Sequence, residues 1–351
     1  MAGLLDVMIA IPIDEAQCAR IAAADRRVRV WYDPGLLPVP AFPGDHAGWS
    51  GFTRDRAGER TWGEMLARAE VLLGIPGGSP AGLADAIARG PRLRWIAAIS
   101  AGAGEQVRAA RLKDDALDRV TITTAAGAHA VPLAEFAMFG LLAMARDAAG
   151  LARAKSKRVW PSRPLPTGEL RDRTLLVLGL GEIGRATARL AAAFGMRVIG
   201  VRRHPGEPVD GVAEQHQLSA LPKLLAGADA VVAALPSTPE TDGVLDAEAL
   251  DSLPRGAWLV NVGRGSVLDE DALADRLRSG RIGGAALDVF ATEPLPPGSP
   301  LWRLPNVIVS PHSAALTAAV DERLVDGFVA NLHRYLAGAP LAHRVDPDGL
   351  Y

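Results

Sequence analysis

Three residues that could carry out acid-base chemistry follow three successive apolar segments in the second half of the sequence. They are Arg264 in the segment VNVGRGSV (260–267), Glu293 in LDVFATEPLP (287–296) and His312 in SPHSAA (310–315). Together they supply a fixed cation, a carboxylate and a proton donor. These are the groups needed to reduce the carbonyl of a small carboxylic acid.

Each of the three residues also has an ordinary structural explanation. Arg264 could pair with the acidic run at 269–271, and His312 could be a buried histidine after a proline. Glu293 could be a solvated residue in a proline-rich loop. Their common position after strands, beside a nucleotide-binding pattern described below, favours the catalytic interpretation.

Short apolar runs alternate with helix-like segments along the chain, a pattern typical of parallel sheets. The runs are DVMIAI, VRVWY, VLLGI, LRWIAAIS and VTITT in the first 125 residues, then TLLVLG, RVIGV, AVVAAL, AWLVNV, GAALDV and VIVSP. They predict an α/β protein with two Rossmann-like, doubly wound parallel sheets. Helices are expected over 131–145 and 317–337, and the irregular stretch between Tyr32 and Thr61 could be a lid or an ordered surface excursion.

Composition narrows the classes of protein that need to be considered. The 351 residues are 49% hydrophobic and 22% charged, enough for about two globular domains. The chain has 40 acidic and 38 basic residues. It therefore lacks the surplus of basic residues that would indicate nucleic-acid binding. Cys18 is the only cysteine, so a disulfide framework and a cysteine-rich metal site are excluded, and no metal is expected.

The expected location is the cytoplasm, without a membrane. The opening run LLDVMIAIPI contains Asp6 and lacks a basic leader, so a buried strand is favoured over a signal peptide. The apolar run 131–145 contains Glu135 and is too short to cross a bilayer. Motifs typical of NTPases, zincins and serine hydrolases do not occur.

A glycine pattern GxGxxG lies between an apolar strand and an amphipathic helix, the context in which it binds a dinucleotide. The first glycine permits a tight turn, the second lets the backbone approach a pyrophosphate, and the third lets helix and strand pack. A turn that serves packing alone is the weaker alternative. The expected cofactor-binding residues here are Gly179, Leu180, Gly181, Glu182, Ile183 and Gly184.

The next strand, RVIGV, ends in Arg202 and Arg203 instead of the acidic residue that holds the ribose of NAD. Two guanidinium groups can pair with a 2′-phosphate, whereas a carboxylate would repel it. We therefore expect NADPH (NADP) to be preferred, with NADH as a second cofactor. Alternatively both arginines are solvated and Glu207 replaces the missing acid.

Several of these segments resemble the D-isomer-specific 2-hydroxyacid dehydrogenase family, and within it the NADPH-preferring glyoxylate and hydroxypyruvate reductases. They are GELRDRTLLVLGLGEIGR, LPSTPET, NVGRGSVLDEDAL, ALDVFATEPLP and SPHSAA, with WIAAISAGAG similar to the family's N-terminal substrate loop. The resemblance covers nearly the whole chain. Glutamate at 293 argues against the family's formate-oxidising branch, which has glutamine there.

The resemblance implies roles for these residues. Arg264 would bind the substrate carboxylate and polarise the keto oxygen, His312 would donate the proton, and Glu293 would favour the imidazolium form. The further cofactor contacts would be Leu235, Pro236, Thr241, Val262, Gly263 and Asp288, with Asp288 accepting from the carboxamide. Ala101 and Gly102 would bind the substrate carboxylate through backbone N–H groups, although SAGAG could be a plain strand-to-helix turn and Gly104 replaces a common aspartate.

The expected protein is a cytoplasmic, homodimeric reductase that converts a small 2-keto acid to its D-2-hydroxy acid. Residues 1–125 with 317–351 would form a flavodoxin-like substrate domain and residues 126–316 a Rossmann dinucleotide-binding domain, with the active site in the cleft between them. The apolar 131–145 helix would pack on a second subunit. Alternatives are a reductase of bulkier 2-keto acids, a phosphite-type oxidation, or a dinucleotide-sensing interaction protein on the same fold.

Overall fold

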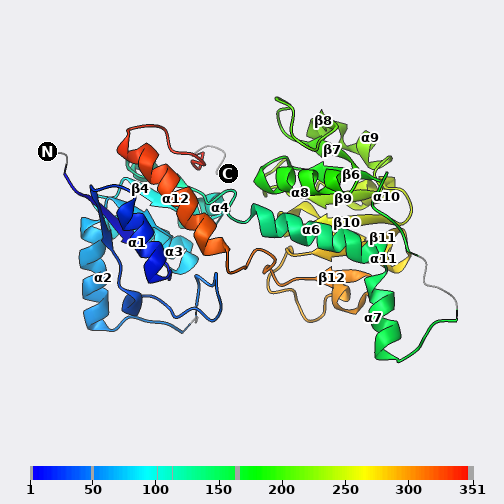
Figure 1. Ribbon diagram of the computed structural model, residues 1–351, viewed down its shortest axis with the longest axis horizontal. Helices are drawn as coiled ribbons and strands as arrows, with labels where there is room; N and C mark the ends of the chain where they lie inside the picture. Colours follow the sequence, from blue (N-terminus) through cyan, green and yellow to red (C-terminus); the bar gives the residue numbers. More distant parts are fainter. Residues whose placement is uncertain (1–2, 49–50, 101, 113, 163–166, 347–351) are drawn as a thin grey trace. The chain divides into compact units, whose positions relative to one another are not determined.

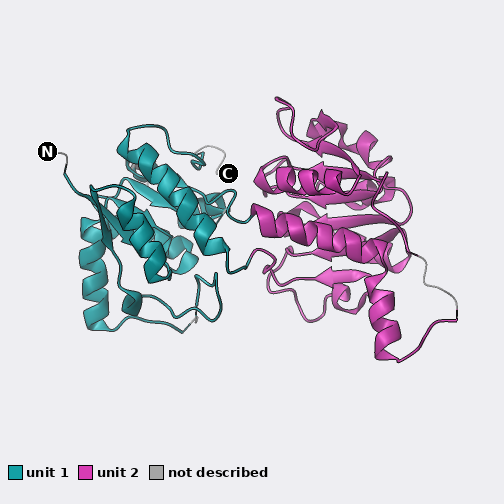
Figure 2. Cartoon of the chain, viewed as in Figure 1, with its two compact units in different colours: residues 1–129, 316–351 teal, residues 130–315 magenta. Residues whose placement is uncertain are grey.

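The computed structural model describes residues 3–48, 51–100, 102–112, 114–162 and 167–346 (Figure 1). The chain forms two compact units, each built around its own sheet (Figure 2). Unit 1 contains residues 1–129 and 316–351, and unit 2 contains residues 130–315. The two α/β parallel-sheet units confirm the fold class expected from the alternation of apolar runs.

Unit 1 has a five-stranded parallel sheet in the order β2-β1-β3-β4-β5. Its strands are β1 (Leu5–Ile9), β2 (Val28–Trp31), β3 (Val71–Leu73), β4 (Trp95–Ala97) and β5 (Thr121–Thr123). Its helices are α1 (Glu15–Ala23), α2 (Arg56–Arg68), α3 (Pro80–Arg89), α4 (Ala103–Ala110), α5 (Asp114–Arg119) and α12 (Val320–Leu336). The sheet is buried on both sides, and α12 contributes Phe328, whose ring stacks 5.0 Å from that of Trp95.

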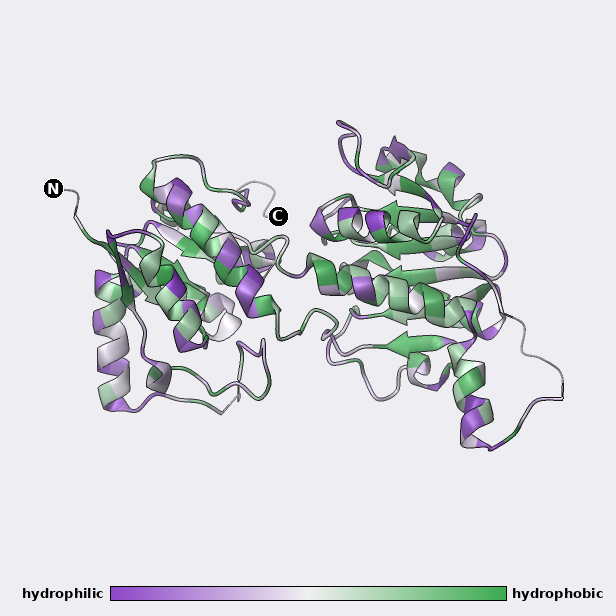
Figure 3. Cartoon of the chain, viewed as in Figure 1, coloured by the Kyte–Doolittle hydropathy of each residue, from purple (hydrophilic) through white to green (hydrophobic). Residues whose placement is uncertain are grey.

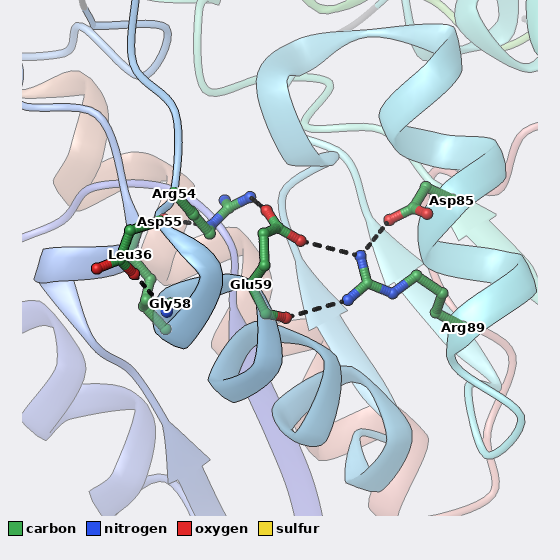
Figure 4. A network of polar contacts seen from close by, with 7 residues as sticks. All are labelled: Leu36, Arg54, Asp55, Gly58, Glu59, Asp85 and Arg89. Carbon is green, nitrogen blue, oxygen red and sulfur yellow. Dashed lines mark hydrogen bonds and ion pairs between the residues drawn. The ribbon is translucent and has the colours of Figure 1, made fainter.

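The segment between β2 and α2 is anchored to unit 1 by polar contacts (Figure 4). Arg54 Nε donates to the carbonyl oxygen of Leu36 at 2.8 Å, which ties the end of the segment to its beginning. Glu59 of α2 accepts from Arg54 at 3.3 Å and from Arg89 of α3 at 3.4 Å. The end of this segment is therefore tied to its beginning and to α2, which is in turn linked to α3.

Unit 2 has a seven-stranded parallel sheet in the order β12-β11-β10-β9-β6-β7-β8. Its strands are β6 (Thr174–Leu178), β7 (Arg197–Val201), β8 (Glu214–His216), β9 (Ala230–Ala233), β10 (Ala257–Asn261), β11 (Ile282–Leu287) and β12 (Val307–Val309). Its helices are α6 (Ala130–Ala145), α7 (Ala148–Ser156), α8 (Glu182–Ala193), α9 (Leu221–Leu225), α10 (Ala247–Ser252) and α11 (Glu270–Arg278). The sequence does not predict the polar edge strand β8, because its three residues, EQH, show no apolar pattern.

The helix α6 confirms the apolar helix expected over 131–145 and is hydrophobic along most of its length (Figure 3). It packs closely on the sheet, since a Cβ on Gly140 would lie 2.6 Å from the Cβ of Ala286 in β11. Glycine at this position allows the helix to approach the strand. Among the described residues, no helix is both long and apolar enough to cross a membrane.

The strands of unit 2 end in register at one edge of the sheet. Leu178 of β6 pairs with both Val201 of β7 and Ala233 of β9. Asn261 of β10 likewise pairs with Ala233 and with Leu287 of β11. Because β6 has β7 on one side and β9 on the other, the chain reverses direction across the sheet here, the position at which open α/β sheets bind ligands.

Candidate active site

The turn that carries Arg264 begins at the carboxyl end of β10. Asn261, the last residue of that strand, is fully buried and closes the turn with its side chain. Its Nδ2 donates to the Arg264 carbonyl oxygen at 2.9 Å, and its Oδ1 accepts from Gly263 N at 3.1 Å. Sequence reasoning missed Asn261, although a polar residue ending a buried apolar strand is itself a signal.

Two glycines allow the Arg264 turn to pack closely between two neighbouring segments. A Cβ on Gly263 would lie 2.6 Å from the Leu235 carbonyl oxygen, in the segment after β9. A Cβ on Gly265 would lie 1.9 Å from the carbonyl carbon of Phe290, in the segment after β11. No larger residue fits at either position, so the GRG triplet sets the backbone of Arg264 against both segments.

Glu293 and His312 form a direct pair at this edge of the sheet. Glu293 Oε2 lies 2.7 Å from His312 Nδ1, while Glu293 Oε1 accepts from Phe290 N at 2.9 Å. The side chains are 36% and 53% exposed, so the pair is open to small molecules. With Nδ1 donating to the carboxylate, Nε2 is the ring nitrogen left to exchange a proton.

Asp288 holds the loop that presents His312. It follows β11, is 2% exposed, and accepts three hydrogen bonds on Oδ1. The donors are Ser310 Oγ at 2.6 Å, Ser313 N at 2.9 Å and Ala314 N at 3.0 Å. Its backbone carbonyl also accepts from His312 N at 2.9 Å.

The backbone of His312 is strained, which explains why the loop needs this anchor. Its φ of 53° lies in the left-handed region that side-chain-bearing residues rarely adopt. Such a conformation persists only where surrounding contacts over-determine it. The bonds to Asp288 on both sides of His312 provide those contacts.

A further carboxylate, Glu270, lies near the pair and was not singled out from the sequence. It begins α11, and its Oε1 accepts from Ala291 N. Burial raises the pKa of the Glu270 carboxyl, and the charges of Asp271 and Glu293 raise it further. The described residues contain no group of three His, Cys, Asp or Glu side chains that could hold a metal ion.

The glycine pattern forms a tight link between β6 and α8. Gly179 has a φ of 95°, and a Cβ there would lie 2.6 Å from the Ala234 carbonyl oxygen. A Cβ on Gly184 would lie 1.8 Å from the Gly179 carbonyl oxygen, so the helix packs directly on the turn. The backbone conformation and close packing therefore require glycine at both positions.

The start of α8 fits the pyrophosphate of a dinucleotide. A Cβ on Gly181 would meet no atom within 4 Å, so this part of the turn faces open space. Gly181 is the N-cap of α8 and has no side-chain capping bond, and Glu182 and Ile183 follow in the first turn. Free N–H groups at a helix N-terminus favour an anion. Leu180, by contrast, is buried in the core.

Arg202 and Arg203 follow β7 at the same edge. Arg202 Nη1 lies 3.4 Å from Gln215 Oε1 of β8, a weak contact, and Arg203 Nη2 lies 3.2 Å from Glu240 Oε2. Arg203 and Glu240 are 50% and 63% exposed, so the ion pair is screened by solvent. Neither of these two contacts therefore holds its guanidinium group strongly.

The remaining cofactor-contact candidates also follow strands of unit 2. Leu235 and Pro236 come after β9, and Thr241 closes their turn by donating to the Pro236 carbonyl oxygen at 2.6 Å. Val262, after β10, is buried. The structure thus brings the unit 2 candidates to the edge formed by the ends of β6, β7, β9, β10, β11 and β12.

The expected substrate loop belongs to unit 1. Gly102 is the N-cap of α4 and has no side-chain capping bond, while Gly104 is buried inside that helix. Ala101 lies outside the described residues.

Known proteins resemble this chain over most of its length. A D-3-phosphoglycerate dehydrogenase of Mycobacterium leprae is 35% identical over 76% of this chain. The chain spans about half of that relative, 49% of its length. A glyoxylate reductase of Korarchaeum cryptofilum is 34% identical, with 73% of this chain and 76% of the relative covered.

A solved structure and a family model agree with these relatives. The crystal structure of a D-isomer specific 2-hydroxyacid dehydrogenase from Xanthobacter autotrophicus, in complex with NADPH and MES, superposes with a TM-score of 0.76. It is 34% identical, and the match covers 100% of both chains. The family model of the NAD binding domain of D-isomer specific 2-hydroxyacid dehydrogenases matches residues 138–314. This chain therefore belongs to the D-isomer specific 2-hydroxyacid dehydrogenase family.

Proposed function

We propose that this protein reduces a small 2-keto acid, of the glyoxylate or hydroxypyruvate type, to the D-2-hydroxy acid. The observation that carries the proposal is the 2.7 Å pair between Glu293 and His312, positioned at the sheet edge that also bears Arg264. A carboxylate-bound imidazole and a guanidinium are suited to a substrate that carries a carboxylate beside a carbonyl.

Each residue of the site has a defined task in this proposal. A nicotinamide dinucleotide, when bound, supplies the hydride that the carbonyl carbon receives. Arg264 binds the substrate carboxylate and stabilises the negative charge that develops on the keto oxygen. His312 donates the proton from Nε2 to that oxygen, and Glu293 holds the imidazole through Nδ1 and compensates its positive charge.

The proposed cofactor preference is for NADPH. Arg202 and Arg203 follow the strand whose end lies next to the glycine turn, and their contacts with Gln215 and Glu240 are long or exposed. The X. autotrophicus relative was crystallised with NADPH, which supports the same assignment. NADH is proposed as a poorer alternative.

The proposed assembly is a homodimer formed through α6 and α8. Three large apolar side chains on these helices or directly after α8 are exposed in the single chain: Phe139 at 53%, Leu190 at 36% and Phe194 at 43%. They border a groove with Met138 and Leu142. A second copy of the chain would remove this apolar surface from water.

The cytoplasmic location and the substrate contacts of residues 101 and 102 stay predictions.

The first prediction concerns the reaction itself. Purified protein with NADPH and glyoxylate or hydroxypyruvate should oxidise the cofactor, measured as loss of nicotinamide absorbance. His312→Ala should lower kcat/KM by roughly 10²- to 10⁴-fold, the usual contribution of a general acid. Binding of NADPH, followed by its fluorescence, should be unchanged.

A matched control is His333→Ala, because His333 lies in α12 and its ring contacts the Ala24 carbonyl oxygen in unit 1. This variant should retain full turnover. Normal turnover by His312→Ala would contradict the assigned acid. Turnover of D-3-phosphoglycerate, with none of either small 2-keto acid, would contradict the proposed substrate class.

The second prediction concerns the cofactor. Replacing Arg202 and Arg203 together by Ala should raise the KM for NADPH by about 10-fold or more, because each charged hydrogen bond contributes roughly 1.5–3 kcal/mol. The KM for NADH should change little. Arg197→Ala, at the other end of β7 and paired with Glu214, is the control. Equal effects on both cofactors would reject the assignment.

The third prediction concerns the anchor of the histidine loop. Asp288→Ala removes the acceptor of Ser313 N and Ala314 N and should lower both kcat and the free energy of unfolding, the latter by about 1–3 kcal/mol. Asp288→Asn keeps an acceptor oxygen and should lose less of each. Kinetics and urea unfolding of the two variants provide the measurement. Full kcat in Asp288→Ala would show that the loop does not need this anchor.

The fourth prediction concerns the dimer. Light scattering after gel filtration should give twice the chain mass for the unaltered protein at micromolar concentration. Phe139→Asp places a charge in the apolar patch and should give the monomer mass. Val39→Asp, at an exposed apolar residue of unit 1, should leave the mass unchanged. A monomeric unaltered protein would exclude the proposed assembly.

A further inference from the structure

Unit 1 contains a cavity that the proposed reaction does not use. It has a volume of about 240 Å³ and lies among α12, the carboxyl ends of β4 and β5, and residues 342–343. Its apolar wall includes Trp95 and Phe328, which are buried, and Ile99, Ala125 and Ala126, which keep part of their surface exposed. Its polar lining includes Arg323, Arg334, His343, Thr124 and Asn331.

The charge of this cavity is positive. Residues 323, 327, 330 and 334 lie on one face of α12 by their helical spacing, and all four line the cavity. Two of them are arginines. Among the described residues that line the cavity, none is Asp or Glu. A ligand that neutralises this charge must be an anion.

Arg323 pairs with no carboxylate among the residues that the structure describes. It is half-buried, and its Nη1 is buried without a hydrogen-bond partner within the described part of the chain. The acid of α12 that lies one turn away on the same face, Asp326, pairs with Arg20 instead. Because a half-buried charge without a partner is costly, an anion at Arg323 would be stabilising.

The other polar groups of the cavity are largely occupied by internal bonds. Asn331 exchanges two hydrogen bonds with the backbone of Ala342, and Arg334 donates to the Pro340 carbonyl oxygen at 3.2 Å. Trp95 Nε1 donates to Thr123 Oγ1 at 2.9 Å. Besides Thr124 and His343, the lining offers a ligand the half-buried guanidinium of Arg323 and an apolar wall, which suits a small molecule with a single anionic end.

We propose that this cavity binds a small monocarboxylate, with its carboxylate on Arg323 and its short hydrocarbon chain against Ile99 and Ala126. The site is additional to the proposed catalytic residues Arg264, Glu293 and His312, which belong to unit 2. The expected substrate loop, residues 101–102, belongs to unit 1. It requires neither a dinucleotide nor turnover. Inorganic phosphate would satisfy Arg323 but leave the apolar wall uncovered, so it should bind more weakly.

The test is calorimetric titration of the full chain with n-butyrate, without cofactor. The protein carries Arg264→Ala, which removes the carboxylate-binding residue of the proposed reaction. Butyrate should still bind this protein. Adding Arg323→Met, which keeps the apolar stem of the side chain, should weaken binding by roughly 10- to 100-fold, as expected for loss of a charged hydrogen bond.

Gly327 provides a second variant that should fold. A Cβ on this residue meets no atom within 4 Å, and Gly327 lines the cavity from within α12. Gly327→Leu should therefore narrow the cavity without strain and also weaken butyrate binding. Arg278→Met, at an exposed arginine of unit 2 paired with Asp275, is the matched control and should bind as before.

Four results would overturn the proposal. They are absence of butyrate binding by the unaltered chain, loss of binding on Arg264→Ala alone, unchanged binding by a folded Arg323→Met protein, and phosphate binding as tight as butyrate. The second would place the carboxylate at the proposed catalytic edge instead. Because the titration needs no turnover, failure of the proposed reaction leaves its outcome interpretable.

Discussion

The carboxylate of Asp288 determines the position of the histidine on which the proposed chemistry depends. One oxygen of this buried side chain collects a hydroxyl and two backbone N–H groups from the loop after β12. Because these three donors share one charged acceptor, their hydrogen bonds stabilise the left-handed backbone conformation of His312, which would otherwise be strained. The histidine can then present a fixed ring nitrogen to Glu293 while half of its side chain stays exposed.

This anchor works because the sheet brings separate segments to one edge. Parallel strands in register place the residues after β10, β11 and β12 side by side, although about 50 residues separate Arg264 from His312 in the sequence. The glycines at 263 and 265 then allow the arginine turn to touch the segments on both sides. Close backbone packing links the arginine turn to the segment that bears Glu293, and a side-chain hydrogen bond links Glu293 to His312.

Arg203 and Arg323 differ in how their positive charges are compensated. Arg203, at the proposed 2′-phosphate position, rests on an exposed carboxylate that water screens. Arg323 in unit 1 is half-buried and has no such partner within the described ranges of the chain. An exposed ion pair is exchanged at little cost, whereas an uncompensated buried cation favours binding of an anion.

The sequence by itself determined the two parallel-sheet α/β units, the helices α6 and α12, and the family, because buried parallel strands are continuous apolar runs and glycine turns have strict spacing. It also identified Arg264, Glu293 and His312 as candidates. It did not predict β8, whose polar residues pair with β7 through backbone groups and through the Arg197–Glu214 ion pair. Nor did it reveal the anchoring by Asp288, the closure of the arginine turn by Asn261, or the missing counter-ion of Arg323. Those features depend on which donors and acceptors meet across long separations in the chain, and only tertiary packing decides that.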